Sequence, residues 1–176
     1  MNRARKVLQM LEQDGYENRV DQWLSKKGWK ETGGIALYTH KKYPLVGVDT
    51  NSGAAEVIAY TSPSEIFNAE GSMIEYSDNL KDIEKAIELA GFLTDLYTQF
   101  TKKFKGTFDG FHFTSHSISA FSKSKKAPWT EIYFDQPGKI VIVIGQPLNK
   151  RVDLPSMKPN AQLAKKVFQW IGDALK

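Results

Sequence analysis

The chain has 176 residues, of which 41% are hydrophobic, 12% aromatic and 25% charged, the composition of an ordinary globular domain. These values exclude a disordered tail, a collagen-like fibre and a low-complexity repeat. A formal net charge of +4 is too small to indicate a nucleic-acid-binding protein, although it is compatible with one.

The absence of cysteine limits both the chemistry and the compartment that suit the chain. Without cysteine there is no disulfide, no thiolate nucleophile and no cysteine-ligated zinc. The basic start of the chain is followed by Gln9 and Glu12 instead of the apolar stretch of a signal peptide. The longest aliphatic run, 140–144, is far shorter than the roughly 20 residues of a membrane helix. We therefore expect a cytoplasmic protein that makes no membrane contact.

The first part of the chain predicts two helices, three strands and a loop. Apolar residues recur at helical spacing through a helical pair at about 3–28, and Gly28 after two lysines is typical of a helix end. Residues 61–76 contain a proline, a glycine and many polar residues, which indicates a loop with at most a short helix at 64–68. The expected strands are 35–40, 45–49 and 55–60.

The second part predicts a long helix, three strands and a final helix. An apolar stripe runs from about Asn79 to Lys105, with acidic residues in its first turns and lysines in its last, which complements the helix dipole. Prolines mark an extended connector from 147 to 159, after which Asn160 can cap the last helix. The expected strands are 110–121, 129–135 and 139–145.

The order of these elements is αα-βββ-α-βββ-α. Because hairpin-like turns join the strands, we expect an α+β fold with antiparallel sheets and helices packed on one face. We expect one domain over 1–176, and an internal boundary, if there is one, near 61–77.

Charge is distributed unevenly along the chain. The net charge is +3 over residues 1–30, −7 over 31–100 and +8 over 101–176. Such a polarity predicts either an anionic partner for the C-terminal part or self-association in which basic and acidic surfaces meet. It is also compatible with charges that are merely spread over a solvated surface.

The densest basic cluster lies in the loop before the predicted strand 129–135. Lysines can bind phosphates and a tryptophan can stack on a base, so this cluster predicts nucleic-acid or nucleotide binding. Lysines at strand edges also discourage aggregation of sheets, and the tryptophan could equally belong to the core. The candidate binding residues are Lys123, Lys125, Lys126, Trp129, Lys150 and Arg151.

Two of the three histidines fall in one predicted strand. Alternation places His112, Thr114 and His116 on one face of it and Phe121 on the other. His112 and His116 are then about 13 Å apart, too far to share a metal ion. A histidine beside a hydroxyl donor is instead suited to acid–base chemistry on a phosphoester. Neither a metal site nor a cofactor is predicted.

The segment Phe111-His112-Phe113-Thr114 resembles the hydrophobic-His-hydrophobic-Thr/Ser motif that the two-histidine phosphoesterases carry in two copies. The resemblance implies a metal-independent phosphoesterase centred on His112 and Thr114. His40 is the candidate for the second histidine, but a lysine stands two positions later where the motif has a hydroxyl residue. The other interpretation is that these polar residues lie on the solvated face of a strand.

The sequence contains no dinucleotide-binding glycine motif, no P-loop and no nucleophile elbow. The lack of a complete catalytic set and the charge polarity favour a non-enzymatic interaction or assembly subunit over an enzyme. Residues 2–8 are also similar to the start of small tailed-phage proteins, which implies a structural or accessory role and a place in a virion. We expect a protein partner or a second copy of the chain. Nucleic-acid or nucleotide binding and phosphoester hydrolysis are the alternatives.

Overall fold

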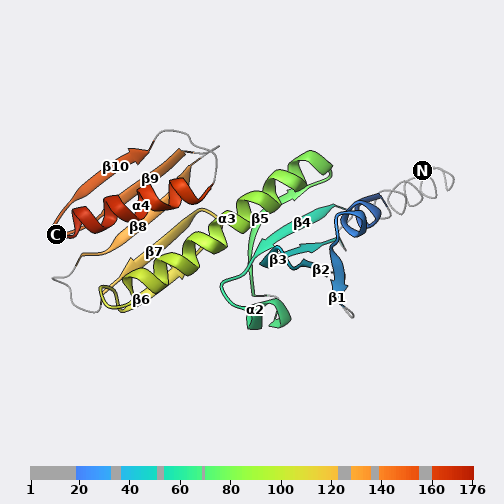
Figure 1. Ribbon diagram of the computed structural model, residues 1–176, viewed down its shortest axis with the longest axis horizontal. Helices are drawn as coiled ribbons and strands as arrows, with labels where there is room; N and C mark the ends of the chain where they lie inside the picture. Colours follow the sequence, from blue (N-terminus) through green and yellow to red (C-terminus); the bar gives the residue numbers. More distant parts are fainter. Residues whose placement is uncertain are drawn as a thin grey trace, which may run out of the picture. The chain divides into compact units, whose positions relative to one another are not determined.

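The computed structural model describes residues 19–32, 37–50, 54–68, 70–122, 128–135, 139–154 and 160–176, without the side chains of Phe67, Asn68 and Asp135. The chain is a mixed α+β protein with two five-stranded antiparallel sheets (Figure 1). It divides into two compact units, Met1–Gly91 and Phe92–Lys176, and the boundary lies inside the long helix α3 (Leu80–Phe104). The expected α+β fold class is confirmed.

Within the described residues, the first unit starts with a helical segment at 19–26. Five strands follow, each pairing antiparallel with the next along the chain. The short helix α2 (Pro63–Asn68) stands between the last two strands, and the first part of α3 follows the sheet. The strands are β1 (Lys30–Thr32), β2 (Leu37–His40), β3 (Tyr43–Asp49), β4 (Ala55–Ala59) and β5 (Ser72–Ser77).

The core of the first unit combines residues of its sheet and its helices. Val46, Val48 and Val57 lie on the central strands and are fully buried, as are Leu24 of the helical segment and Ile83 of α3. Burial of each such side chain contributes about 1.5–3 kcal/mol. The apolar stripes that the sequence predicts for these elements therefore hold this unit together.

The second unit repeats the sequential strand order of the first. Its sheet follows the later part of α3 and is followed by α4 (Ala161–Ala174), and both helices lie on the same face of the sheet (Figure 1). The side-chain oxygen of Asn160 accepts a hydrogen bond from Leu163 N, which confirms the predicted helix cap. The strands are β6 (Gly110–Phe113), β7 (Ser117–Phe121), β8 (Thr130–Asp135), β9 (Lys139–Ile144) and β10 (Lys150–Leu154).

Phenylalanines dominate the contact between the helices and the second sheet. Phe100 of α3 stacks on Phe168 of α4, with centroids 6.4 Å apart, and meets Phe111 of β6 edge-on at 5.6 Å. Lys103 adds a cation over the Phe168 ring at 5.6 Å. Aromatic pairs contribute about 0.5–1.5 kcal/mol beyond their buried area, so this cluster fixes both helices on the sheet.

The predicted order of elements matches the observed one except in detail. The long helix and the short helix at 64–68 are confirmed as α3 and α2. Three strands were not predicted: β1, β5 and β10. Each is an edge strand or a very short one, so its apolar residues are partly exposed and the alternation in its sequence is weak.

The chain divides into two compact units, and this division does not test whether residues 1–176 behave as one domain, so the expected single domain stays a prediction. Residues 3–18 of the predicted helical pair lie outside the described residues, and the second helix of that pair is present at 19–26. Among the described helices, none has the length and apolar character needed to cross a membrane.

Candidate functional site

The histidine-bearing segment of the second unit is a hairpin instead of the continuous strand that the sequence predicted. β6 ends at Phe113 and β7 begins at Ser117. The Thr114 hydroxyl holds the turn between them, because it accepts hydrogen bonds from Ser117 N at 2.9 Å and His116 N at 3.2 Å. The expectation that His112, Thr114 and His116 share one strand face is therefore wrong, since His116 lies in the turn.

The residues proposed for phosphoesterase chemistry are distributed over both units. His112 is exposed on the edge strand β6, and the Thr114 hydroxyl is occupied by the turn. His40 is the last residue of β2 in the first unit, where its Nδ1 accepts the N–H of Lys42 at 3.0 Å. No group of three or more potential metal ligands is present among the described residues. The phosphoesterase activity stays a prediction.

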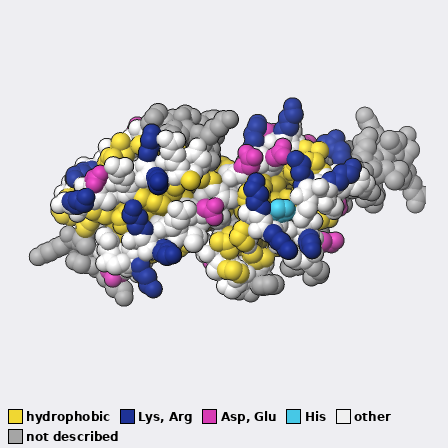
Figure 2. All heavy atoms as spheres, in the orientation of Figure 1, with side chains coloured by type: hydrophobic (Ala, Val, Ile, Leu, Met, Phe, Trp, Pro, Cys, Tyr) yellow, Lys and Arg dark blue, Asp and Glu magenta, His cyan; other side chains and the backbone are white. Residues whose placement is uncertain are grey.

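The predicted basic surface is only partly described. Lys123, Lys125 and Lys126 lie outside the described residues. Lys150 donates from Nζ to Ala174 O, at the end of α4, at 2.8 Å. Basic side chains are spread over the face of the second unit seen in Figure 2, with hydrophobic side chains between them. Nucleic-acid binding stays a prediction.

Register and ring contacts identify the face of the second sheet that the helices cover. Phe113 of β6 meets Tyr97 of α3, with ring centroids 5.5 Å apart. Ile118, Ile132 and Ile142 lie in register with Phe113 and are fully buried. Alternate residues of each strand point to the other side, which none of the described helices covers. We call that side the open face, formed by Phe121, Trp129, Glu131, Tyr133, Val141, Val143, Arg151 and Asp153.

Three aromatic side chains of the open face are accessible to solvent. Phe121 is 50% exposed, Trp129 41% and Tyr133 40%. Two of them lie against glycines, namely Gly110 of β6 and Gly145, which follows β9. A Cβ atom at Gly110 would be 2.2 Å from the Phe121 ring, and one at Gly145 would be 2.0 Å from Trp129 Nε1. The missing side chains let the rings lie on the backbone, which gives the sheet a broad apolar surface.

Polar and charged side chains of this side of the sheet contact one another, and Asp153 lies within 4 Å of two cations, Arg151 and, at 3.8 Å, Lys139 of β9. Arg151 Nε donates to Asp153 at 3.0 Å, and this hydrogen bond and the Arg151 charge lower the pKa of the carboxyl. The Tyr133 hydroxyl donates to Glu131, and this hydrogen bond, with a smaller effect of burial, raises the pKa of Tyr133. One cation and one anion thus stand side by side on β10.

The position of Phe121 on this face corrects the sequence analysis, which placed it opposite His112. The register pairs Gly110 with Phe121 and His112 with Ser119, so His112 and Phe121 point to the same side. The turn at Thr114 reverses the chain between them and changes the parity. The turn contains neither glycine nor proline, so its only signal in the sequence is the group of hydroxyl residues Thr114, Ser115 and Ser117.

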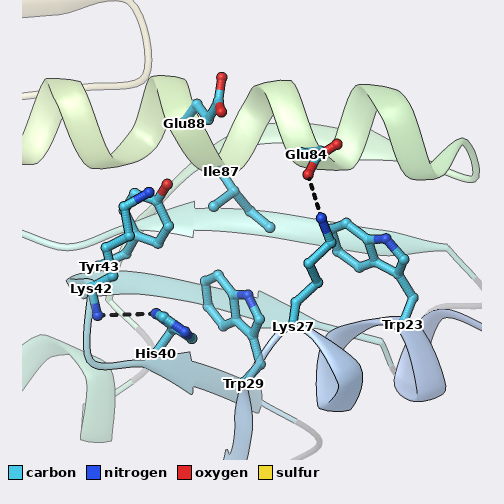
Figure 3. A pocket seen from close by; sticks show the side chains of 9 residues that line it. All are labelled: Trp23, Lys27, Trp29, His40, Lys42, Tyr43, Glu84, Ile87 and Glu88. Atoms are coloured by element: carbon cyan, nitrogen blue, oxygen red, sulfur yellow. Dashed lines mark hydrogen bonds and ion pairs between the residues drawn. The ribbon is translucent and has the colours of Figure 1, made fainter. Parts of the chain in front are cut away.

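A cavity of about 190 Å³ lies in the first unit, between the helical segment, the β2–β3 turn and α3 (Figure 3). We call it the aromatic pocket, because its walls are Trp23, Trp29, His40 and Tyr43, with Ile87 of α3 pointing toward Trp29. Trp29 and Tyr43 are stacked, with centroids 6.2 Å apart and planes 16° apart. The Trp29 and His40 centroids are 5.3 Å apart.

A glycine-terminated helix end positions Trp29. Gly28 has φ +87°, and its N–H donates to Ser25 O at 3.0 Å, while Trp29 N donates to Leu24 O at 3.0 Å. This is the Schellman arrangement, in which a left-handed glycine lets the chain leave the helix. It places the Trp29 side chain, which is buried, at the floor of the pocket.

The β2–β3 turn and α3 position the other rings. The hydrogen bond that Lys42 N donates to His40 Nδ1 requires a lone pair on Nδ1, so the neutral His40 ring carries its proton on Nε2. Tyr43 lies against Gly91 of α3, where a Cβ atom would be only 2.6 Å from the ring. Except for His40, these residues carry no signal of a site in the sequence, because the helical segment, β2, β3 and α3 bring them together only in the folded chain.

Four charged side chains stand at the rim of the aromatic pocket. Lys27 and Glu84 form an ion pair of 2.9 Å. Lys42 Nζ lies 4.8 Å from the centroid of the Tyr43 ring. A hydrogen bond and a charge interaction with Tyr43, and to a smaller extent the charge of Glu88, raise the pKa of Lys42. Neither Lys42 nor Glu88 makes an ion pair with any described residue.

Comparison of the chain with known protein families, with curated proteins and with solved structures finds no match. Its function is therefore inferred from the geometry of the open face and the aromatic pocket.

Proposed function

We propose that the chain is a non-enzymatic assembly subunit that pairs with a second copy of itself through the open face of its second sheet. The observation that carries this proposal is the uncovered apolar surface of Phe121, Trp129 and Tyr133. Such a role fits the structural or accessory function that residues 2–8 suggest.

The shape and composition of the open face suit a sheet-to-sheet interface. Two antiparallel sheets pack face to face about 10 Å apart, with their strands roughly aligned. Aromatic residues are enriched in the cores of protein interfaces, where they bury a large area with little loss of side-chain entropy. Val143 lies opposite Glu131 on the adjacent strand, is partly exposed and extends the apolar surface, whereas Val141, opposite Tyr133, is buried.

The charges of the open face are arranged so that a second copy complements them. In register, Val143 lies opposite Arg151 and Val141 opposite Asp153, which defines two parallel rows across the strands. A two-fold axis between these rows sets each Arg151 opposite Asp153 of the other copy and each Val143 opposite Val141. Because the contact is isologous, the pairing of Arg151 in one copy with Asp153 in the other occurs twice in the dimer.

The proposal is tested by measuring the molar mass of the full chain by light scattering at concentrations up to about 100 µM, where a pair with micromolar Kd is largely assembled. We expect a dimer for the wild type and a monomer for Arg151→Asp and for Asp153→Arg, because each variant places like charges across the interface. Mixing the two variants restores the dimer, since one is then acidic and the other basic at both positions.

A further pair of variants separates the face from general surface effects. Val143→Asp, in the centre of the open face, abolishes pairing, whereas Met73→Asp, at an exposed position of the first unit, leaves it unchanged. Circular dichroism confirms that each variant is folded. A monomeric wild type, or a mixture of the two charge variants that stays monomeric, contradicts the proposal.

A further inference from the structure

We propose that the aromatic pocket of the first unit binds a free α-amino acid with an aromatic side chain. The side chain would lie against Trp29, Tyr43 and Ile87, the ammonium group at Glu88 and the carboxylate at Lys42. This inference concerns a different unit from the open face and does not depend on self-association.

The size of the pocket limits the ligand to a small molecule. Its volume of about 190 Å³ is below the roughly 300–1,000 Å³ of sites that hold drug-sized ligands or whole cofactors. Trp29, Ile87 and Tyr43 form its floor, with Trp29 and Ile87 largely buried and the Tyr43 ring stacked on Trp29, while polar groups surround its opening. Planar rings stack favourably on such walls, so an aromatic side chain is the group that fits the floor.

The charges at the rim select the polar part of the ligand. Lys27 and Glu84 already neutralise each other. Lys42 and Glu88 stand at the same rim, carry opposite charges, and lack an ion-pair partner among the described residues. A ligand with one ammonium and one carboxylate group can satisfy both, and each hydrogen bond to a charged group is expected to raise the affinity by about tenfold or more.

Ligands with a single charge fit this rim less well. An anion at Lys42 lies beside the carboxylate of Glu88, and a cation at Glu88 lies beside the ammonium group of Lys42. Each arrangement adds a repulsion to the attraction it gains. The zwitterion converts both rim charges into attractive contacts, which is why the pocket favours an amino acid over an amine or an acid.

The test is a calorimetric titration of the full chain with L-phenylalanine, followed in parallel by tryptophan fluorescence from Trp23 and Trp29. Three analogues serve as matched probes: phenethylamine lacks the carboxylate, 3-phenylpropionate lacks the ammonium group, and N-acetylphenylalanine amide lacks both charges. We expect L-phenylalanine to bind at least about tenfold more tightly than any analogue.

Variants at the rim identify the contacts. Lys42→Met and Glu88→Gln each weaken L-phenylalanine binding by about tenfold and remove the preference over the analogue that lacks the corresponding charge. Lys85→Met, on α3 outside the pocket, leaves the affinity unchanged. All three positions are exposed, so the variants are expected to fold.

Three results would overturn the proposal: no binding of L-phenylalanine, equal binding of a singly charged analogue, or unchanged affinity in both rim variants. The titration is repeated with the Arg151→Asp variant. This variant is expected to bind L-phenylalanine with unchanged affinity. A wild type that binds L-phenylalanine but is monomeric means that only the self-association proposal has failed, whereas a dimeric wild type that does not bind it means that only the pocket proposal has failed.

Discussion

The indole ring of Trp129 occupies the space above Gly145 that a side chain at that position would need. Trp129 immediately precedes β8 and Gly145 immediately follows β9, and Gly145 N donates to Trp129 O at 2.9 Å. Phe121 and Gly110 repeat the relationship on β7 and β6. At both positions an aromatic ring of the neighbouring segment occupies the space of the missing side chain, so a larger residue would have to displace the ring.

Gly145→Ala is expected to displace the Trp129 ring, since an added Cβ atom would lie 2.0 Å from Nε1. Overpacking of this kind lowers the free energy of unfolding by about 1–3 kcal/mol. Urea denaturation in the Arg151→Asp background measures the loss without a contribution from assembly. Gly172→Ala is the control: it has open space within α4 and is expected to raise stability by about 0.5–1 kcal/mol. Equal stability of Gly145→Ala and wild type would contradict the contact.

Gly28→Ala is expected to destabilise the first unit by about 1 kcal/mol or more, because alanine strains a backbone at φ +87°. The added Cβ atom would also lie 3.3 Å from His40 Nε2, which disturbs the wall of the aromatic pocket. Gly28→Asn is the matched variant, because asparagine tolerates the left-handed conformation better. Thermal denaturation is expected to rank the variants Gly, Asn, Ala in decreasing stability.

Tyr38 makes stability depend on pH in the alkaline range. Burial, then the charge of Asp21 and a hydrogen bond to it, and finally the charge of Glu31 raise the pKa of Tyr38 to about 12. The unfolded chain, with a tyrosine pKa of about 10, loses this proton first. The contribution is therefore fully present below pH 10 and is lost as the pH rises toward 12.

The Tyr38→Phe variant isolates this effect. It removes the hydroxyl and its hydrogen bond, at a cost of about 1 kcal/mol at neutral pH. Its stability is then expected to fall less steeply than that of the wild type between pH 10 and 12. Chemical denaturation at several pH values measures both curves, and parallel curves in that range would refute the assignment to Tyr38.

Thr114→Val is expected to lower the free energy of unfolding by about 1 kcal/mol, because the hairpin turn loses the hydroxyl that accepts from His116 N and Ser117 N. Thr114→Ser keeps the oxygen and should restore most of the loss. His112→Ala, at an exposed edge position, is expected to change stability by less than about 0.5 kcal/mol. Denaturation curves of the three variants decide whether Thr114 has this structural role.

The phosphoesterase prediction has its own test on the same residues. Cyclic and linear oligonucleotides are incubated with the wild type and with His112→Ala, and hydrolysis is followed by chromatography. Activity that His112→Ala leaves unchanged excludes this site. Since the Thr114 hydroxyl already holds the turn, we expect no activity that depends on His112.

Local signals explain which elements the sequence predicted. α3 and α4 are evident because a 3.6-residue apolar stripe and, in α4, the Asn160 cap are properties of a continuous segment. β5 and β10 escaped prediction because an edge strand pairs on one side only and is partly exposed, so its own sequence shows a weak apolar alternation. The β6–β7 turn escaped because its Thr114 hydroxyl replaces the usual glycine or proline.

The candidate sites divide in the same way. Composition and charge polarity predicted an assembly subunit, but they indicated the lysine cluster and Trp129 as its interaction surface. The open face was not evident, because Phe121, Tyr133 and Arg151 meet only through the register of β7 to β10.

By itself, the sequence determined the fold class, the two long amphipathic helices and the absence of every cysteine-dependent function, because periodicity and composition act locally. Only the tertiary structure decided which residues share a surface. Strand register placed Phe121 with His112, and the packing of α3 over the β2–β3 turn combined Trp29, Tyr43 and Glu88 in one pocket. Such proximities depend on strand register and on helix packing, which are set by contacts between elements and leave no local signal in the sequence of any one of them.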